Sequence, residues 1–111
     1  MSQGSCRVLL TADARRDLAS IVGYLARQDG DKAAERLLEK LLATKESLAT
    51  FPDRGSVPAE LLELGSREFR QAICRPYRLI YIVAGGDVVV YIIADGRRDF
   101  QTLLARRLLA R

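Results

Sequence analysis

Residues 77–94 limit the fold most strongly, because two apolar runs, YRLIYIVA and DVVVYIIA, lie on either side of Gly85-Gly86. Two glycines between apolar runs are typical of the tight turn of a β-hairpin. Alternate residues of a strand face opposite sides, and here both sets are apolar. A strand that is apolar on both faces needs a cover on each side. The hairpin is therefore expected at the centre of a layered fold.

The turn also predicts a register for the hairpin. A two-residue turn at Gly85-Gly86 would pair Tyr81 with Val90 and Arg78 with Ile93. In that register Arg78 and Asp95 are diagonal neighbours on one face, within reach of an ion pair. A surface ion pair contributes about 1 kcal/mol or less, so this pair on its own would be a minor structural feature.

Residues 12–51 show the period of amphipathic helices. Thr11 is a candidate N-cap after a short strand over residues 6–11. Two helical stretches are separated by Asp29-Gly30-Asp31, which predicts an antiparallel helical hairpin. The second helix should end at Phe51, because a proline disfavours helix at the residue before it. The apolar positions are Ala14, Leu18, Ile21, Val22 and Leu25 in the first helix, and Ala34, Leu37, Leu38, Leu41, Leu42, Leu48 and Phe51 in the second.

The remaining segments complete the sheet and its second cover. Residues 67–74 are predicted as a third strand, so that residues 67–94 form an antiparallel meander. Residues 58–64 can form one or two helical turns. Residues 98–110 can supply part of this second cover as a final helix with Leu103, Leu104, Leu108 and Leu109, or a partner protein can supply it. The expected class is α+β in a single domain over residues 1–111: an N-terminal strand, a helical hairpin on a small, mostly antiparallel sheet, and a short C-terminal helix. The pairing of the first strand stays open.

The composition excludes several kinds of chemistry. The chain has no histidine, which removes Ser-His-Asp and Cys-His catalysis and the usual zinc sites. Cys6 and Cys74 lack a CxxC spacing and are expected to be buried and reduced. We therefore predict no catalytic residue, no metal and no cofactor. The sequence has no stretch of the ~20 apolar residues that span a membrane and no signal peptide, so we expect a cytoplasmic protein without membrane contact.

Positive charge is concentrated in the second part of the chain. Residues 1–66 carry nine Lys or Arg against ten Asp or Glu, whereas residues 67–111 carry nine Arg against four acids. Arginine suits bidentate recognition of carboxylate or phosphate and cannot act as a base. Five arginines are expected to gather where the strands end and to form a surface that binds a macromolecular target or a second protein partner: Arg70, Arg75, Arg78, Arg97 and Arg98.

The order of these elements resembles the RelE/ParE superfamily of toxins from type II toxin-antitoxin systems, and its ParE-like branch in particular. The resemblance covers nearly the whole chain. The matching segments are LTADARRDLASIVGYL (10–25), FPDRG (51–55), YRLIYIV (77–83) and VVVYIIADGRRDFQTLLARRL (88–108). The long, uninterrupted helical hairpin is the feature that favours the ParE-like branch.

The resemblance implies one of two activities. RelE-like members cut messenger RNA on the ribosome, and their two arginine positions fall on Arg78 and Arg98. Their terminal tyrosine position falls on Leu104, however, and their two strand lysines fall near Arg70 and Ala72. RNA cleavage needs a group that accepts a proton, which arginine does poorly. The only substitutes would be tyrosines or the acids Glu68, Asp95 and Asp99, which more simply serve packing and ion pairing.

The resemblance therefore favours a non-enzymatic ParE-like toxin that binds and inhibits DNA gyrase, alone or in its complex with DNA. The alternatives are a RelE-like ribosome-dependent mRNA endonuclease, and a non-toxic basic binding module. The toxin hypotheses imply a cognate antitoxin, with a helix on the helical hairpin and an extended segment along the sheet. The assembly stays open between a homodimer and a heterotetramer with the antitoxin.

Overall fold

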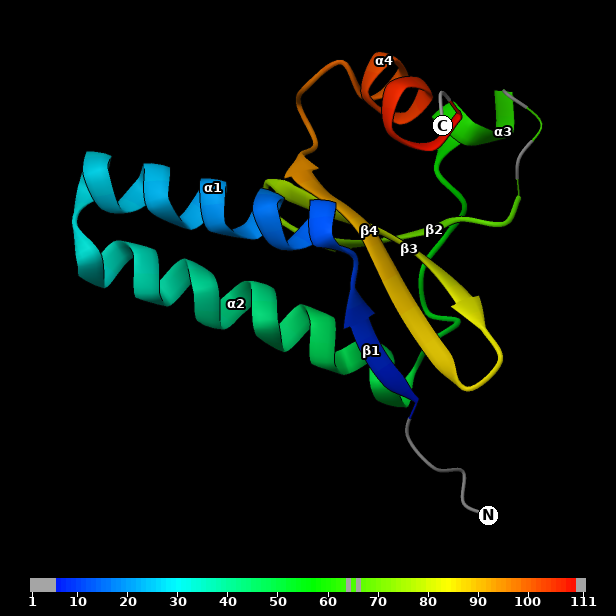
Figure 1. The fold of residues 1–111 in the computed structure, drawn as a ribbon, viewed down its shortest axis with the longest axis horizontal. Coiled ribbons are helices and arrows are strands. Elements are labelled where there is room, and N and C mark those ends of the chain that lie inside the picture. Colours follow the sequence, from blue (N-terminus) through cyan, green and yellow to red (C-terminus); the bar gives the residue numbers. More distant parts are fainter. Residues whose placement is uncertain (1–5, 64, 66, 110–111) are drawn as a thin grey trace.

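The computed structural model describes residues 6–63, 65 and 67–109, without the side chain of Leu109. Figure 1 shows two long antiparallel helices beside a twisted sheet, with the short helices at one end of that sheet. The elements in chain order are β1 (Arg7–Leu10), α1 (Ala12–Asp29), α2 (Asp31–Thr50), α3 (Ala59–Glu63), β2 (Arg70–Cys74), β3 (Tyr77–Ala84), β4 (Asp87–Asp95), α4 (Phe100–Leu104) and the π-helical turn η1 (Ala105–Leu109). The predicted α+β architecture is confirmed.

The sheet has four strands in the order β1-β4-β3-β2. The strands β2, β3 and β4 form the predicted antiparallel meander. The strand β1 answers the question that the sequence left open, because it pairs in parallel with β4, from Arg7 opposite Asp87 to Leu10 opposite Val90. Since β1 is short, the second half of β4 has no strand on that side within the described part of the chain.

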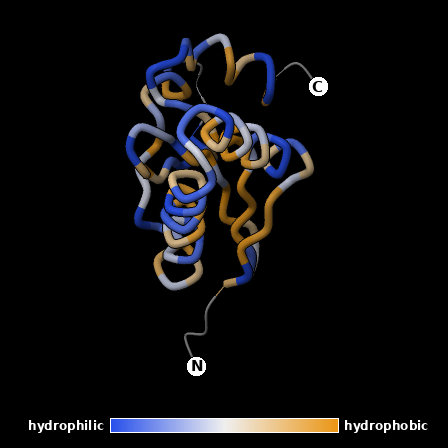
Figure 2. Tube along the Cα trace, turned by 90° about the vertical axis from the view of Figure 1, so that its left-hand side faces the viewer, coloured by the Kyte–Doolittle hydropathy of each residue, from blue (hydrophilic) through white to orange (hydrophobic). Residues whose placement is uncertain are grey.

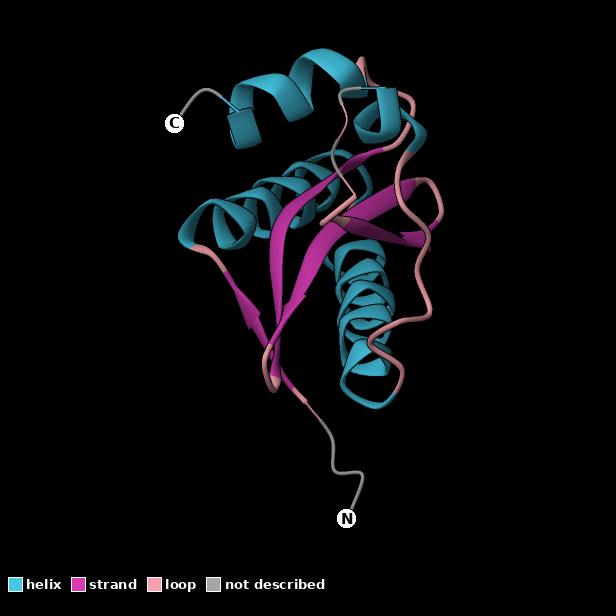
Figure 3. Ribbon diagram, turned by 90° about the vertical axis from the view of Figure 1, so that its right-hand side faces the viewer, coloured by secondary structure: helices cyan, strands magenta, loops and turns pink. Residues whose placement is uncertain are grey.

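The helical hairpin forms for the reasons that its sequence suggests. The hydroxyl of Thr11 accepts a hydrogen bond of 3.1 Å from the backbone of Ala14 and caps α1. Gly30 alone joins the two helices, with a φ of 97° that favours glycine. The helix α2 ends at Thr50, before Phe51-Pro52. The hairpin then lies against one face of the sheet, as Figure 3 shows.

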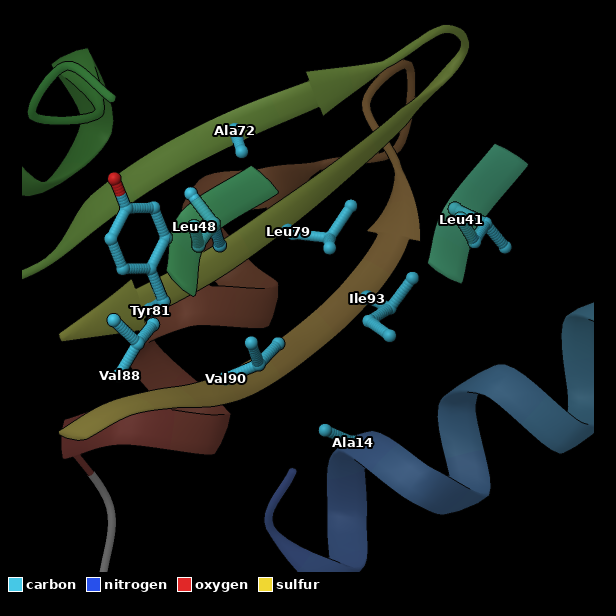
Figure 4. Packing of buried hydrophobic residues seen from close by; sticks show 9 residues of the cluster. All are labelled: Ala14, Leu41, Leu48, Ala72, Leu79, Tyr81, Val88, Val90 and Ile93. Atoms are coloured by element: carbon cyan, nitrogen blue, oxygen red, sulfur yellow. The ribbon is translucent and has the colours of Figure 1, made fainter. Parts of the chain in front are cut away.

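Two hydrophobic clusters lie on opposite faces of the sheet. Figure 2 shows hydrophobic residues concentrated along the strands and alternating with hydrophilic ones along the helices. The first cluster, drawn in Figure 4, joins the helical hairpin to one sheet face and contains Ala14, Leu41, Leu48, Ala72, Leu79, Tyr81, Val88, Val90 and Ile93. The second joins the opposite face to the short helices through Leu61, Ile80, Ile92, Ala94, Phe100, Leu103, Leu104 and Leu108. The sequence left this cover open between residues 98–110 and a partner protein, and the described part of residues 98–110 supplies it together with α3.

The predicted hairpin register is correct near the turn and wrong beyond it. Tyr81 pairs with Val90 as expected, but a β-bulge follows, and Ile80 pairs with Ile92. The bulge inserts one extra residue, Tyr91, into β4, which moves every later residue by one position. Arg78 consequently faces Ala94 and not Ile93. A shift of one residue reverses the face of each side chain, so Arg78 and Asp95 lie on opposite faces, and the ion pair that the predicted register would have allowed does not form.

Three smaller predictions are adjusted. The strand predicted over residues 67–74 begins at Arg70, and Phe69 packs edge-on against Tyr91 with ring centroids 5.5 Å apart. The final helix begins at Phe100, after Asp99 caps it by accepting a hydrogen bond from the Thr102 backbone. Both cysteines are free thiols, and they are half-buried beside the first cluster where full burial was expected.

Candidate functional site

The five arginines predicted as a binding surface separate into two groups. Arg70 and Arg78 lie in strands, are partly buried and bond to the protein itself. Arg75, Arg97 and Arg98 lie in the turns after β2 and β4 and are exposed. We call these last three the strand-exit arginines.

Arg78 connects β3 to the elements that cover the second sheet face. Its two terminal nitrogens donate to the Glu60 carboxylate at 3.0 and 2.9 Å, and its Nε donates to Gln71 at 2.8 Å. Its guanidinium also lies 3.9 Å from the centre of the Phe100 ring. The hydrogen bonds from Arg78 lower the pKa of Glu60. With only 13% of its side chain exposed, Arg78 serves as an internal support for α3 and α4.

Arg70 supports the loop that follows α2. It donates to the backbone oxygens of Gly55 at 2.8 Å and Asp53 at 3.3 Å. The buried hydroxyl of Tyr81 completes the same support, since it donates to Pro52 at 2.8 Å and accepts from the Gly55 backbone at 3.1 Å. Arg70 and Tyr81 together fix the segment FPDRG against the sheet.

The turn after β4 holds one ion pair in solvent. Arg97 donates to the two carboxylate oxygens of Asp95 at 3.0 and 2.7 Å. These hydrogen bonds lower the pKa of Asp95. The Arg97 side chain is 79% exposed, so the pair is a weak one and its guanidinium still faces solvent.

The turns after β2 and β4 lie against one another. The backbone of Gly96 donates to the Pro76 oxygen at 2.7 Å. A Cβ atom at Gly96 would lie 2.7 Å from the Cδ of Arg78, so a glycine is needed for this close approach. The contact brings Arg75 to the same end of the sheet as Arg97 and Arg98. Within the described residues, the side chains of Arg75 and Arg98 form no hydrogen bond or ion pair.

A cleft of about 430 Å³ opens beside these turns, between α1 and the ends of β3 and β4. We call it the strand-exit cleft. Burial, together with the Asp95 carboxylate, raises the pKa of Tyr77 in its wall. Its lining residues are Asp17, Ser20, Ile21 and Tyr24 from α1, and Tyr77, Ile93, Ala94, Asp95 and Arg98 from the sheet end.

Asp17 and Arg107 close the edge of β4 beyond the end of β1. Asp17 accepts a hydrogen bond of 3.0 Å from the Ile93 backbone, and Arg107 donates to the Tyr91 oxygen at 2.9 Å. The two side chains also pair with each other at 3.0 and 3.2 Å. The sequence reasoning missed both residues. An acid between the apolar positions of α1 was the available signal for Asp17, because such a carboxylate needs a buried partner.

The strand-exit arginines can bind an anionic group, but the charged side chains around them offer little for proton transfer. Arginine stays protonated, and the nearby carboxylates of Asp17, Glu60 and Asp95 each accept from an arginine. Among the described residues, no group of three or more acids or cysteines is placed to hold a metal ion. No helix of the described chain is long and apolar enough to cross a membrane.

The family model of the ParE toxin of the type II toxin-antitoxin system parDE matches residues 8–100. The chain belongs to this family. Its relatives include Toxin ParE3 of Caulobacter vibrioides (strain ATCC 19089 / CIP 103742 / CB 15), with 28% identity over 101 residues, which cover 91% of this chain and 97% of ParE3. The predicted membership of the RelE/ParE superfamily, in its ParE-like branch, is confirmed. The chain is a ParE-like toxin of a type II toxin-antitoxin system.

Two solved structures share the fold of this ParE-family toxin. The chromosomal ParDE system from P. aeruginosa superposes with a TM-score of 0.69 at 17% identity, over 82% of this chain and 96% of that chain. The toxin-antitoxin complex RelBE2 from Mycobacterium tuberculosis gives a TM-score of 0.62 at 21% identity, over 85% and 94% of the two chains. At such low identities these likenesses establish the fold alone.

Proposed function

We propose that this ParE-family toxin acts without chemistry of its own, by binding DNA gyrase and stalling it, and that a cognate antitoxin neutralises it. Its strand-exit arginines are the contact surface for an anionic partner. Family membership supports the toxin role, since the family is that of the parDE systems. Gyrase as the target follows from the ParE-like resemblance of the sequence.

The engagement of Arg78 is the observation that carries the non-enzymatic proposal. Of the positions that correspond to the RelE-like pattern, Arg78 is bound by Glu60 and Gln71, and Leu104 and Ala72 are buried in the clusters. Arg98 alone among them is exposed and unpaired within the described residues. One free guanidinium can hold a phosphate or carboxylate, but it cannot accept a proton.

The surface around the helical hairpin supports the antitoxin proposal. A shallow groove with almost wholly apolar walls runs between α1 and α2, lined by residues that include Leu18, Val22 and Leu38. Exposed apolar residues such as Leu42 extend the same face. An amphipathic helix from the antitoxin would bury this surface. The solved relatives include toxin-antitoxin complexes.

Paired assays test the target. Purified protein is added to a gyrase supercoiling and cleavage assay and, in parallel, to ribosomes programmed with messenger RNA. We expect inhibition and trapped DNA cleavage in the first assay and intact messenger RNA in the second. Cleavage of messenger RNA without any effect on gyrase would instead establish the endonuclease alternative.

Two variants separate the target surface from the antitoxin surface. Arg98→Ala removes a strand-exit arginine, whereas Arg67→Ala removes an exposed arginine before the other end of β2 and serves as the matched control. We expect Arg98→Ala to lose growth inhibition but still to co-purify with the antitoxin. Retained growth inhibition with lost co-purification would assign the strand-exit arginines to the antitoxin.

A further inference from the structure

The strand-exit cleft has two walls of different origin. Four α1 residues, at positions 17, 20, 21 and 24, form one helix face, and the ends of β3 and β4 form the other wall. Figure 1 shows α1 continuing past the point where β4 ends. Its volume of about 430 Å³ lies within the usual range of small-ligand sites.

The unpaired charge in the cleft lining is positive within the described residues, although two carboxylates also line the cleft. Asp17 is neutralised by Arg107, and Asp95 is neutralised by Arg97. Arg98 has no such partner within the described residues, and the exposed Arg75 lies at the same end. The cleft therefore suits an anionic ligand.

The cleft also carries aromatic surface that the fold does not use. Tyr24 is 60% exposed, which is unusual for so large a side chain, and it lines the cleft together with the half-buried Tyr77. Aliphatic groups of Ile21, Ile93 and Ala94 form the rest of the apolar lining. Aromatic rings beside free cationic groups are the combination that binds unpaired nucleobases and their phosphates.

The hydrogen bonding of β4 argues against a peptide strand in the same place. The edge of β4 beyond Val90 would be the site for such a strand, but Asp17 already accepts from the Ile93 backbone and Arg107 donates to Tyr91. A peptide would thus lose the backbone bonds that give strand addition its affinity. A base paired within a duplex is not accessible to a cleft of this size either.

We propose that the strand-exit cleft binds a single-stranded nucleic-acid segment, with a base against Tyr24 and Tyr77 and the flanking phosphates on Arg98 and its neighbouring arginines. This site goes beyond the proposed function, which requires only a protein target. It would let the toxin touch an exposed strand as well as protein.

Binding is measured with the purified full chain and a fluorescein-labelled oligothymidylate of about 12 nucleotides, a length within the range of single-strand binding sites. Anisotropy gives the affinity, and the same oligonucleotide as a duplex is the comparison. The chain has four tyrosines and no tryptophan, so quenching of tyrosine emission reports stacking directly. We expect the single strand to bind at least about tenfold more tightly than the duplex and to quench the emission.

Variants locate the site. Tyr24→Ala should weaken binding by about 5- to 150-fold, and Tyr24→Phe should restore it, because stacking needs the ring and not the hydroxyl. Arg98→Ala should weaken binding and reduce the salt dependence by about one phosphate contact. Asp95→Asn should strengthen binding, since it frees Arg97. Phe51→Ala, at a 64% exposed aromatic residue far from the cleft, and Arg67→Ala are the controls.

Three results would overturn the proposal: equal affinity for duplex and single strand, equal losses in Phe51→Ala and Tyr24→Ala, or displacement by polyglutamate as efficient as by unlabelled oligonucleotide. The last result would show a site for acidic peptide. Circular dichroism of each variant verifies that it is folded. Because gyrase inhibition is measured separately, failure here leaves the proposed function standing, and failure there leaves this site standing.

Discussion

Arg78 and Arg98 lie at the same end of the sheet, but they differ in burial and in side-chain partners. Arg78 is 13% exposed, and hydrogen bonds to Glu60 and Gln71 hold it beneath the short helices. Arg98 is exposed and, within the described residues, has no side-chain partner. The difference arises from position. Arg78 lies within β3, a central strand of the sheet, whereas Arg98 lies in the turn after β4 has ended.

This contrast shows that arginines predicted to gather at one end of a sheet need not all belong to one exposed surface. An arginine inside a central strand must find partners within the protein, because an unpaired buried charge is very costly. An arginine in a turn carries no such requirement and is free for a partner. The basic end of this toxin therefore consists of an internal support and, outside it, the exposed strand-exit arginines that we propose as a contact surface.

Arg78→Ala tests the internal group most severely. It leaves the partly buried Glu60 without its cation, and we expect a loss of about 2–3 kcal/mol in the free energy of unfolding, somewhat below the value for fully buried pairs. Urea denaturation measures this loss. The matched Arg97→Ala breaks only the solvent-exposed pair and should change stability by about 0.5 kcal/mol or less. Equal effects of the two variants would remove the distinction.

Asp17→Ala tests the boundary between the internal support and the cleft. The variant leaves the Ile93 amide and Arg107 without their shared acceptor, which should cost about 1.5–2 kcal/mol. Hydrogen exchange at the Ile93 amide should accelerate in the variant. Asp13→Ala, one helical turn away and 55% exposed, should cost about 0.5 kcal/mol. An unchanged exchange rate at Ile93 would contradict the role of Asp17.

The periodicity of the sequence was enough to predict the elements. The glycine pair, the capping Thr11 and Phe51-Pro52 are local signals, and each acts where the structure places a turn or a helix end. The two covers of the sheet followed from strands that are apolar on both faces. The helix ends and the meander could thus be predicted because short sequence signals determine them, and a single sequence contains those signals.

The bulge at Tyr91 could not be predicted, and the site depends on it. The run VVVYIIA is apolar at every position, so sliding it by one residue brings no polar side chain into either core. The register decides which face Arg78 and Asp95 occupy, and the neighbourhood predicted for these two side chains was wrong for this reason. Glu60, the true partner of Arg78, comes from a connector whose place in the fold no local pattern reveals.

The stability that the Arg78–Glu60 pair contributes should depend on pH. Arg78 lowers the pKa of Glu60, so the pair stabilises the fold above the ordinary glutamate pKa, and this stabilisation disappears as the pH falls through the lowered value. Glu60→Gln should cost about 1 kcal/mol at neutral pH and progressively less in acid. Urea denaturation of both proteins from neutral to acidic pH measures this gap. A gap that stays constant throughout would show that the Glu60 carboxylate contributes no charge pairing.

Arg98→Ala should have the smallest effect on the fold and thereby completes the comparison. The side chain is exposed and forms no ion pair within the described residues, so we expect the free energy of unfolding to change by less than about 0.5 kcal/mol. Urea denaturation of the purified variant beside the wild type measures this. A loss comparable with that of Arg78→Ala would place Arg98 among the internal supports. An unchanged fold, combined with lost growth inhibition, would mean that this arginine is retained for its partner, because nothing in the packing of the sheet requires it.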